Sequence, residues 1–588
     1  MSKVTLHNIL SLRKIMAKHN IDVYVVPHHD ENFSEYVPPN KERLRWASGF
    51  SGSAGTLLIT SNKLYLFTDG RYTLQAKNQT KGLNCKIVNI SDCTFLSFLE
   101  NNSSKFKSIG INSKTISLFE YNKLYKFISK KIKLIDNCLI DYLWKRKLST
   151  QESSKIFFLP TKFCGENINK KLIKASAYLT KEKADYIFSQ NSESIAWLFN
   201  MRGADLPHTP LVFCSALIGK DKQKIFFENK KIPEKIKKYF PKSTKIHTYS
   251  EMSNVLTKSC KKSSKIIIDE KKLSLFNFNL LQKVSKNLLV KDDILLSYRS
   301  IKNPTEIKCS IKAHILDAVS LCKFLYWYKN SDGILSELDV VEKIDSLRKE
   351  NPGFICPSFP TIAGAGKNGA IIHYQPDKRT NKKIYDNDIL LLDSGGQYLS
   401  GTTDVTRTIT RKSNVAQNIV NDYTLVLKSH IRVNLSKFPP GTPGSFLDSV
   451  ARTILWDNGE DFAHSTGHGV GFCLNVHEGP FSISLRNFSP LYEKMIFSNE
   501  PGIYKNGKYG IRIENLVFTK SVTLNKKKFL VLKTLTLVPY EKDLIDKSLL
   551  NLAEKNWLNN YHKNVIKNIS PMLNNLEKKW LETQCKEI

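Results

Sequence analysis

The stretch from Asp393 to Glu514 constrains this chain more than any other feature, because acidic side chains recur there beside short apolar or glycine-rich segments. Four carboxylates and one imidazole come from separated segments: Asp393, Asp404, His468, Glu500 and Glu514. Crowded, ionised carboxylates repel one another, and burying each one costs solvation free energy. A fold that gathers this set therefore needs positive charge among the oxygens, and two divalent cations roughly 3.5–4 Å apart would supply it.

The chemistry of this donor set indicates which metal it suits. Oxygen-rich ligation with a single histidine favours Mn²⁺, leaves Co²⁺, Fe²⁺ and Zn²⁺ as alternatives, and disfavours a thiolate zinc site. A single aspartate after a strand usually caps a turn, and a single histidine is usually a satisfied polar group. The five residues taken together favour a metal site over that simpler explanation.

The sequence around the two aspartates predicts a pair of strands. Residues 389–392 form a short apolar run that ends at Asp393 and is typical of a buried strand. Residues 395–396 are both glycine and predict a tight turn. Residues 402–410 are rich in β-branched side chains, which predicts a returning strand that carries Asp404. We therefore expect both aspartates on neighbouring antiparallel strands.

The histidine segment has the spacing of a helical metal motif but the composition of a strand or loop. His464 and His468 are four residues apart, yet glycines at alternate positions in 467–471 disfavour a helix. Farther along, residues 510–514 alternate with period two, so Arg512 and Glu514 are expected to share a face. The sequence predicts that Arg512 is a partner that holds the carboxylates in place.

These motifs resemble those of the pita-bread metallopeptidases, and among them the Xaa-Pro aminopeptidases (aminopeptidase P). The histidine segment reads His464-Ser-Thr-Gly-His468, followed by Asn-Val-His477-Glu-Gly-Pro, and His373 stands upstream in AIIHYQP. The resemblance extends to the N-terminal part, with GFSGSAGT at residues 49–56 and TDGRY at residues 68–72. It covers nearly the whole chain, as in the long, three-domain eukaryotic form.

The resemblance implies an activity and a role for each residue. It implies hydrolysis of the N-terminal Xaa-Pro bond of peptides by a hydroxide that two divalent metal ions activate, most readily two Mn²⁺. Asp393 and Asp404 would hold one ion, and Asp404, His468, Glu500 and Glu514 the other, with Asp404 and Glu514 bridging. Glu500 would also act as general base. Three histidines would stabilise the oxyanion and carry a proton to the prolyl nitrogen: His373, His464 and His477.

Other functions stay open at this point. A prolidase of the same fold would cleave only Xaa-Pro dipeptides, and the two leading domains favour the aminopeptidase over it. A methionine aminopeptidase generally lacks those domains. A non-catalytic interaction protein on this fold would have lost metal ligands, whereas all five positions are filled here.

Length and the resemblance together predict the domain organisation. A chain of 588 residues exceeds what one hydrophobic core supports. The expected fold class is α/β (α+β), with two creatinase-like N-terminal domains followed by a pita-bread catalytic domain. We expect domains over residues 1–150 and 151–303, with the second repeating the rhythm of the first, a catalytic domain over 304–540, and a helical tail over 541–588 packed on it.

Composition limits the cellular setting. The net charge is +35, but lysines are spread along the chain and no nucleic-acid-binding motif accompanies them, so we expect no specific nucleic-acid partner. The 11 cysteines are scattered without a C-x-x-C pair, as in a reducing compartment. The first residues predict an amphipathic helix with Leu10, Leu12, Ile15 and Met16 on its apolar face, and no signal peptide. No run is apolar enough to span a bilayer. We expect a cytoplasmic protein without a membrane partner, and the resemblance implies a homodimer through the catalytic domain.

Overall fold

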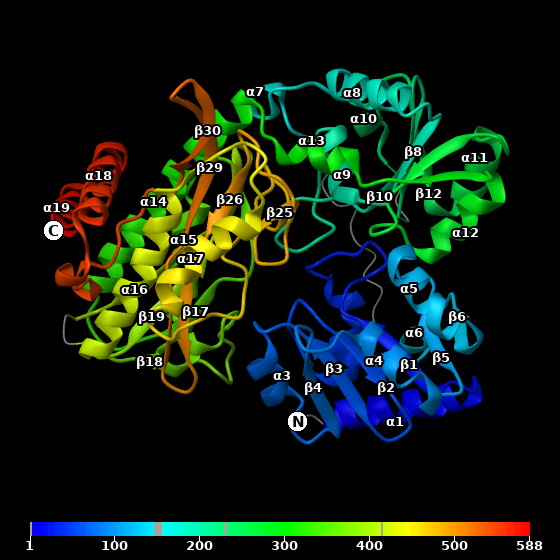
Figure 1. Ribbon diagram of the computed structural model, residues 1–588, viewed down its shortest axis with the longest axis horizontal. Helices are drawn as coiled ribbons and strands as arrows, with labels where there is room; N and C mark the ends of the chain where they lie inside the picture. Colours follow the sequence, from blue (N-terminus) through cyan, green and yellow to red (C-terminus); the bar gives the residue numbers. More distant parts are fainter. Residues whose placement is uncertain (1–2, 146–155, 229–231, 413–414) are drawn as a thin grey trace. The chain divides into compact units, whose positions relative to one another are not determined.

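The structure, a computed structural model, describes residues 3–145, 156–228, 232–412 and 415–588 (Figure 1). The chain divides into two compact units. The first contains residues 1–160, 166–207 and 211–295, and the second, the catalytic unit, contains residues 161–165, 208–210 and 296–588. The expected domain boundary between residues 150 and 151 lies outside the described residues, and the boundaries at 303 and 540 stay predictions.

The first unit contains two six-stranded mixed sheets whose topologies match. The first sheet has the order β4-β3-β2-β1-β5-β6 and the second the order β12-β11-β10-β8-β13-β14. In both sheets the third strand pairs antiparallel with its two neighbours, and the other pairs are parallel. The strands are β1 (Val23–Pro27), β2 (Thr56–Ile59), β3 (Leu64–Thr68), β4 (Cys85–Asn89), β5 (Ile109–Asn112), β6 (Ile132–Ile135), β8 (Tyr186–Ser189), β10 (Cys214–Gly219), β11 (Gln223–Phe227), β12 (Thr244–Thr248), β13 (Lys265–Ile268) and β14 (Asn287–Val290).

Helix α1 (Lys3–Lys18) forms where the sequence predicts it, but one face residue differs. Leu12 and Met16 are buried as expected, whereas Leu10 is 49% exposed and Ile9 is buried instead. Positions 9, 12 and 16 fall on one side of an α-helix, so the prediction for Leu10 was wrong by one residue. The other helices of this unit are α2 (Arg43–Ser48), α3 (Thr73–Gln79), α4 (Phe95–Asn101), α5 (Leu118–Ile128), α6 (Leu139–Leu143), α8 (Ile168–Lys181), α9 (Ser192–Leu198), α10 (Glu234–Lys237), α11 (Met252–Ser259) and α12 (Leu275–Val284).

The catalytic unit is built on two antiparallel sheets. A three-stranded sheet has the order β17-β19-β22, and a six-stranded sheet has the order β23-β30-β29-β26-β24-β25. Their strands are β17 (Ile362–Ala365), β19 (Ile389–Ser394), β22 (Val405–Thr410), β23 (Lys437–Phe438), β24 (Gly467–Gly469), β25 (Glu478–Ile483), β26 (Ile496–Asn499), β29 (Asn515–Leu524) and β30 (Lys527–Thr534). A third, three-stranded sheet has the order β16-β20-β21, and the other short strands form the pairs β15-β18 and β27-β28. These strands are β15 (Leu335–Ser336), β16 (Phe354–Pro357), β18 (Lys383–Ile384), β20 (Gly396–Tyr398), β21 (Gly401–Thr402), β27 (Gly502–Lys505) and β28 (Tyr509–Arg512).

Helices cover these sheets and the C-terminal helices complete the core. A long helix begins at Pro304, because the Asn303 side chain accepts a hydrogen bond from the Glu306 N–H and Glu306 returns one. Helix α17 packs on β25, and α16 packs on β26 and β30. Near the C-terminus, the Tyr561 hydroxyl lies 3.1 Å from Nη2 of Arg407 on β22. The helices are α14 (Pro304–Asn330), α15 (Glu337–Lys349), α16 (Gln417–Asn434), α17 (Gly444–Trp456), α18 (Leu552–Ile569) and α19 (Asn575–Gln584).

Across the described ranges, no helix combines the length and the apolar character that a bilayer crossing needs.

Two buried histidines in this core predict how stability depends on pH. Burial, followed by the nearby Arg407 charge, lowers the pKa of His430 to about 3 and that of His562 to about 4. Both are therefore neutral in the folded protein, whereas an unfolded chain takes up protons below a pKa of about 6.5. Their contribution to stability is present above that pH and is lost as the pH falls towards 4 and 3.

We expect the thermal unfolding midpoint of the wild-type chain to fall as the pH is lowered from about 7 to about 5. His562→Gln keeps an acceptor for the Tyr540 N–H, which lies 3.3 Å from His562 Nε2, but removes the titration. Differential scanning calorimetry should therefore show a smaller decrease in the variant. An equal decrease in both proteins would contradict this assignment.

Candidate metal centre

Two adjacent strands carry the first pair of candidate ligands. Asp393 lies in β19, and β22 runs antiparallel beside it with Asp393 opposite Thr406. Asp404 directly precedes β22 and is not inside it. The expected turn at residues 395–396 is also wrong, because Gly396 starts the short hairpin of β20 and β21. A Cβ atom on Gly395 would collide with the carbonyl oxygen of Thr403, so the glycine there permits a close backbone approach.

The histidine segment is a strand, within the strand-or-loop prediction. His468 is the middle residue of β24, between two glycines. A Cβ on Gly467 would meet the Ser498 carbonyl oxygen, and one on Gly469 would meet that of Glu478. The His468 N–H donates to Ser498 Oγ at 2.9 Å, and this hydroxyl lies 3.1 Å from Glu500 Oε1. Close strand packing thus brings His468 and Glu500 together.

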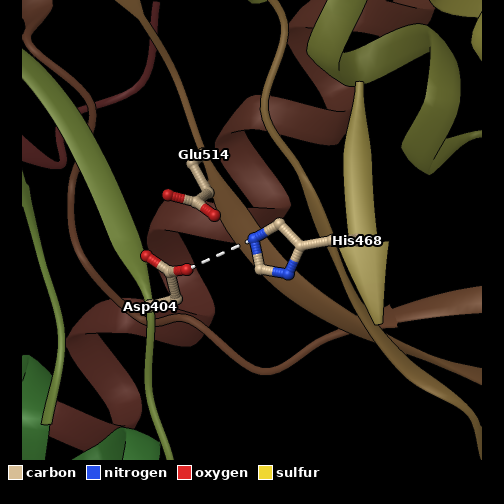
Figure 2. A group of neighbouring side chains, drawn as sticks. All are labelled: Asp404, His468 and Glu514. Carbon is tan, nitrogen blue, oxygen red and sulfur yellow. Dashed lines mark ion pairs between the residues drawn. The ribbon is translucent and has the colours of Figure 1, made fainter. Parts of the chain in front are cut away.

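The imidazole of His468 lies beside the side chains of Asp404 and Glu514, which come from separate segments (Figure 2). Its Nε2 atom lies 3.5 Å from Asp404 Oδ2 and 3.5 Å from Glu500 Oε1. One ligand atom each from Asp404, His468 and Glu514 lies within 4.8 Å of the other two. Glu514 follows β28, and its Oε2 accepts a hydrogen bond from Thr406 Oγ1 at 2.8 Å.

Arg512 ties Asp393 to this cluster, in agreement with the sequence-based prediction. Its Nη2 atom lies 2.6 Å from Asp393 Oδ2, its Nε atom lies 3.2 Å from Thr406 Oγ1, and that Nε atom is 4.0 Å from Glu500 Oε2. We refer to Asp393, Asp404, His468, Glu500 and Glu514 as the carboxylate cluster. Its carboxylates outnumber the single guanidinium that binds among them.

The atoms of the cluster fit divalent cations. Among the described residues, the buried oxygens Asp393 Oδ1, Asp404 Oδ1 and Glu514 Oε1 have no hydrogen-bond partner. Burial, then repulsion from Asp393 and Glu500, raises the pKa of Asp404 well above its ordinary value. Burial, then repulsion from Asp404, does the same for the pKa of Glu514. Unpaired oxygens and uncompensated negative charge beside one imidazole are the donor set of Mn²⁺ and related ions.

Two of the three remaining histidines have defined places near the cluster. The His477 ring stands perpendicular to the His468 ring with centroids 4.2 Å apart. His464 Nδ1 lies 2.8 Å from the Ser465 carbonyl oxygen, and its Nε2 lies 2.8 Å from the Tyr504 hydroxyl. A neutral His464 therefore donates from Nδ1 and accepts the Tyr504 O–H at Nε2.

Tyr504 is a residue that the sequence analysis missed. Its hydroxyl accepts a hydrogen bond from Arg512 Nη1 at 2.7 Å, which connects His464 to the arginine that binds Asp393. Burial raises the pKa of Tyr504 to about 12, so the phenol stays a donor. The available signal was the alternating pattern on both sides of the turn at 506–508, since β27 and β28 pair and Tyr504 lies opposite Gly510.

His373 lies apart from these contacts along the chain. It is partly exposed, in the turn after the short helix η5 (Gly366–Ala370). That helix packs against β19, which carries Asp393, and against β28, which carries Arg512. The turn that holds His373 therefore follows a helix that packs on the strands of Asp393 and Arg512.

Family models match the chain in four consecutive segments. A creatinase/prolidase N-terminal domain matches residues 9–139 and a second matches 147–306. Metallopeptidase family M24 matches residues 308–521, and the C-terminal region of that peptidase matches 528–588. Such a fold, with a buried cluster of carboxylates and an imidazole, defines a metallopeptidase.

Similar proteins narrow this class. Xaa-Pro aminopeptidase 1 of Dictyostelium discoideum is 37% identical, over 100% of this chain and 97% of that protein. The X-prolyl aminopeptidase of Caenorhabditis elegans, described as a cytosolic enzyme with a di-nuclear active site, is 32% identical over 100% of both chains with a TM-score of 0.94. A prolidase of Pyrococcus horikoshii OT3 is 26% identical with a TM-score of 0.50, over 63% of this chain and 99% of its own.

The chain belongs to the Xaa-Pro aminopeptidases of metallopeptidase family M24 and is a hydrolase. The predicted fold class is thereby confirmed: two creatinase-type N-terminal domains precede a pita-bread catalytic domain. The prediction of an enzyme is confirmed as well.

The cluster geometry predicts the effect of removing one carboxylate charge. Asp404→Asn keeps the shape of the side chain but weakens the attraction for cations at the centre of the cluster. We expect purified Asp404→Asn to retain fewer divalent ions per chain than the wild type in elemental analysis after dialysis. Asp317→Asn serves as the control, because Asp317 is a buried aspartate paired with Arg348 at 2.8 Å. Unchanged metal content in Asp404→Asn would show that Asp404 is not a ligand.

Proposed function

We propose that this chain removes the N-terminal residue from peptides that have proline in the second position. The observation that carries the proposal is the convergence of Asp404, Glu500 and Glu514 around His468, with buried oxygens left unpaired. Similarity over the full length to proteins named Xaa-Pro aminopeptidase supports the substrate class.

In this proposal the carboxylate cluster would hold two divalent ions, preferably Mn²⁺, with Co²⁺ or Zn²⁺ as substitutes. Asp393 and Asp404 would hold one ion, and Asp404, His468, Glu500 and Glu514 would hold the other. When bound, such ions lower the pKa of a water molecule towards neutrality and polarise the scissile carbonyl. The description of the Caenorhabditis elegans relative as di-nuclear supports two ions rather than one.

The side chains supply proton transfer and orientation. Glu500 takes the proton of the attacking water, since its Oε1 atom lies beside His468 and is held by Ser498 Oγ at 3.1 Å. His373, His464 and His477 stabilise the developing oxyanion and deliver a proton to the prolyl nitrogen. That nitrogen has no N–H in the substrate, so the ring of proline must be recognised by shape rather than by an amide hydrogen bond.

A prolidase is the alternative within the same fold. The Pyrococcus horikoshii OT3 prolidase covers 63% of this chain, whereas the aminopeptidase of Caenorhabditis elegans covers 100%. The two full creatinase-type domains therefore favour the aminopeptidase. A non-catalytic interaction protein is the alternative from another class, and the filled cluster disfavours it.

One assay separates the three functions. Metal-stripped protein is titrated with Mn²⁺, Co²⁺ and Zn²⁺ and given an Xaa-Pro-Pro tripeptide and an Xaa-Pro dipeptide. We expect added metal to restore cleavage of the Xaa-Pro bond of the tripeptide. The second proline, at position three, does not prevent an aminopeptidase from cleaving that bond. Cleavage of dipeptides alone would identify a prolidase. Failure to bind or respond to any of the metals would support the non-catalytic alternative.

We further propose a cytoplasmic homodimer joined through the catalytic unit, with no specific nucleic-acid or membrane partner. Large apolar side chains exposed on α17 and the loop after β25 support self-association: Phe446 is 57% exposed, Trp456 43% and Phe488 75%. The Ser445 N–H donates to the Asn487 carbonyl oxygen at 3.1 Å, so the neighbouring residues Phe446 and Phe488 lie on adjacent segments.

Light scattering on the purified chain should give twice the mass of 67.2 kDa. Phe488→Asp should shift it towards the monomer, because a charge would be desolvated in the contact. Binding of DNA, if seen, should disappear steeply with salt because only non-specific charge would drive it. A monomeric wild type, or a sequence-selective DNA complex at physiological salt, would overturn this assignment.

A further inference from the structure

A buried ion-pair triad lies next to one of the histidines and has no part in the chemistry assigned so far. Glu478 is the first residue of β25 and directly follows His477. Its Oε2 atom lies 2.7 Å from Arg299 Nη1, and its Oε1 atom binds Lys302 Nζ. We call Glu478, Arg299 and Lys302 the Glu478 triad.

Both cations of the triad come from one short segment at the start of the catalytic unit. Arg299 lies in α13 (Ile294–Ser300), and the division between the two units falls inside this helix, after Leu295. The Lys302 N–H donates to the Lys494 carbonyl oxygen at 2.9 Å. Lys494 leads into β26, and Glu500 follows the end of that strand. The segment is therefore anchored both beside His477 and on the approach to Glu500.

The triad is coupled to the cluster through backbone pairing. Strand β25 pairs with β24 such that Glu478 lies opposite Gly469, with an irregularity in register between His468 and Gly469. The His477 ring in turn packs perpendicular to the His468 ring, with centroids 4.2 Å apart. A shift of the Glu478 backbone would displace His477 against His468.

Energetics favour a geometric purpose for the triad. Glu478 is 3% exposed, Arg299 4% and Lys302 1%. Desolvating three charges is unfavourable, and apolar side chains of similar shape often give equal or greater stability. The charges instead fix the orientation of Glu478, because two donors from one segment bind both oxygens of its carboxylate. That carboxylate belongs to the residue after His477.

We propose that Arg299 and Lys302 are positioning residues that act through Glu478 to hold the His477 imidazole against His468. The proposal rests on the proposed function, in which His477 takes part in proton transfer. It adds that accurate placement of the His477 imidazole depends on residues 299–302, which follow one of the points where the chain passes from the first unit to the second.

Lys302→Met is the informative substitution. It removes one of the two contacts but leaves Glu478 paired with Arg299, so a neutral pair remains in the interior. Lys302→Arg keeps a cationic donor and is the conservative variant. Lys329→Met is the matched control, because Lys329 Nζ lies 2.8 Å from Glu541 Oε2 in another buried ion pair of the same unit.

With an Xaa-Pro-Pro peptide, Lys302→Met should lower kcat about 10–100-fold, as expected for a displaced catalytic side chain. Its KM and its metal content should stay close to those of the wild type, and Lys302→Arg should recover part of the loss. Lys329→Met should lower the thermal unfolding midpoint but leave kcat unchanged. Loss of metal in Lys302→Met, or an equal loss of kcat in the control, would overturn the proposal.

A double-mutant cycle tests whether the effect passes through His477. If it does, Lys302→Met should cause no further loss of kcat in the His477→Ala background, because the group that it displaces is gone. Additive losses would show that the triad acts elsewhere.

A crystal structure of Lys302→Met gives a readout that does not need activity. The separation of the His468 and His477 ring centroids should depart from 4.2 Å. An unchanged separation would refute the positioning role. If the ring is displaced in Lys302→Met but the wild-type protein cleaves no Xaa-Pro peptide, the proposed function is refuted and the positioning role stands.

Discussion

Repulsion among four carboxylates, three of them buried, is the main constraint on the catalytic unit. Asp393, Asp404, Glu500 and Glu514 approach one another in a region from which water is largely excluded, where each charge acts strongly on the next. Arg512 offsets one of these charges by binding Asp393 at 2.6 Å. The rest of the unit must hold this unfavourable set together until cations balance it.

Strand pairing provides the restraint. Each carboxylate sits at or just beyond the end of a strand whose backbone is bonded to a neighbour, so its position is fixed by the sheet rather than by its own contacts. Asp393 is opposite Thr406, the Glu514 N–H donates to the Thr406 carbonyl at 3.1 Å, and the Glu500 N–H donates to the Thr466 carbonyl at 2.8 Å. Helices α16 and α17 pack on the strands from outside. The rigidity of paired strands thus counters the repulsion of their side chains.

Local sequence patterns predicted the parts of this arrangement that depend on local chemistry. Glycines around His468 disfavoured a helix, and His468 lies in a strand. Patterns failed where contacts between residues that are not neighbours along the chain decide the outcome. The hairpin of β20 and β21 exists because Gly395 lets Thr403 approach, and sequence alone does not reveal that partner. Tyr504 was missed for the same reason, since its partners Arg512 and His464 become neighbours only when β27, β28 and the histidine segment assemble.

Three other buried carboxylates of the same unit are each bound to a cation. Asp317 is matched by Arg348, Glu541 by Lys329, and Glu478 by two cations. These sets are closed: each carboxylate has a cationic partner within the chain, so none calls for a ligand.

The carboxylate cluster differs because its four negative charges exceed the positive charge of Arg512 beside them. Three of its buried oxygens also lack a hydrogen-bond donor among the described residues. Several buried carboxylates crowded together with open oxygens would destabilise the fold unless something positively charged bound there. The contrast between closed and open sets therefore argues for cations at the cluster independently of any relative, and it separates residues that position from residues that bind.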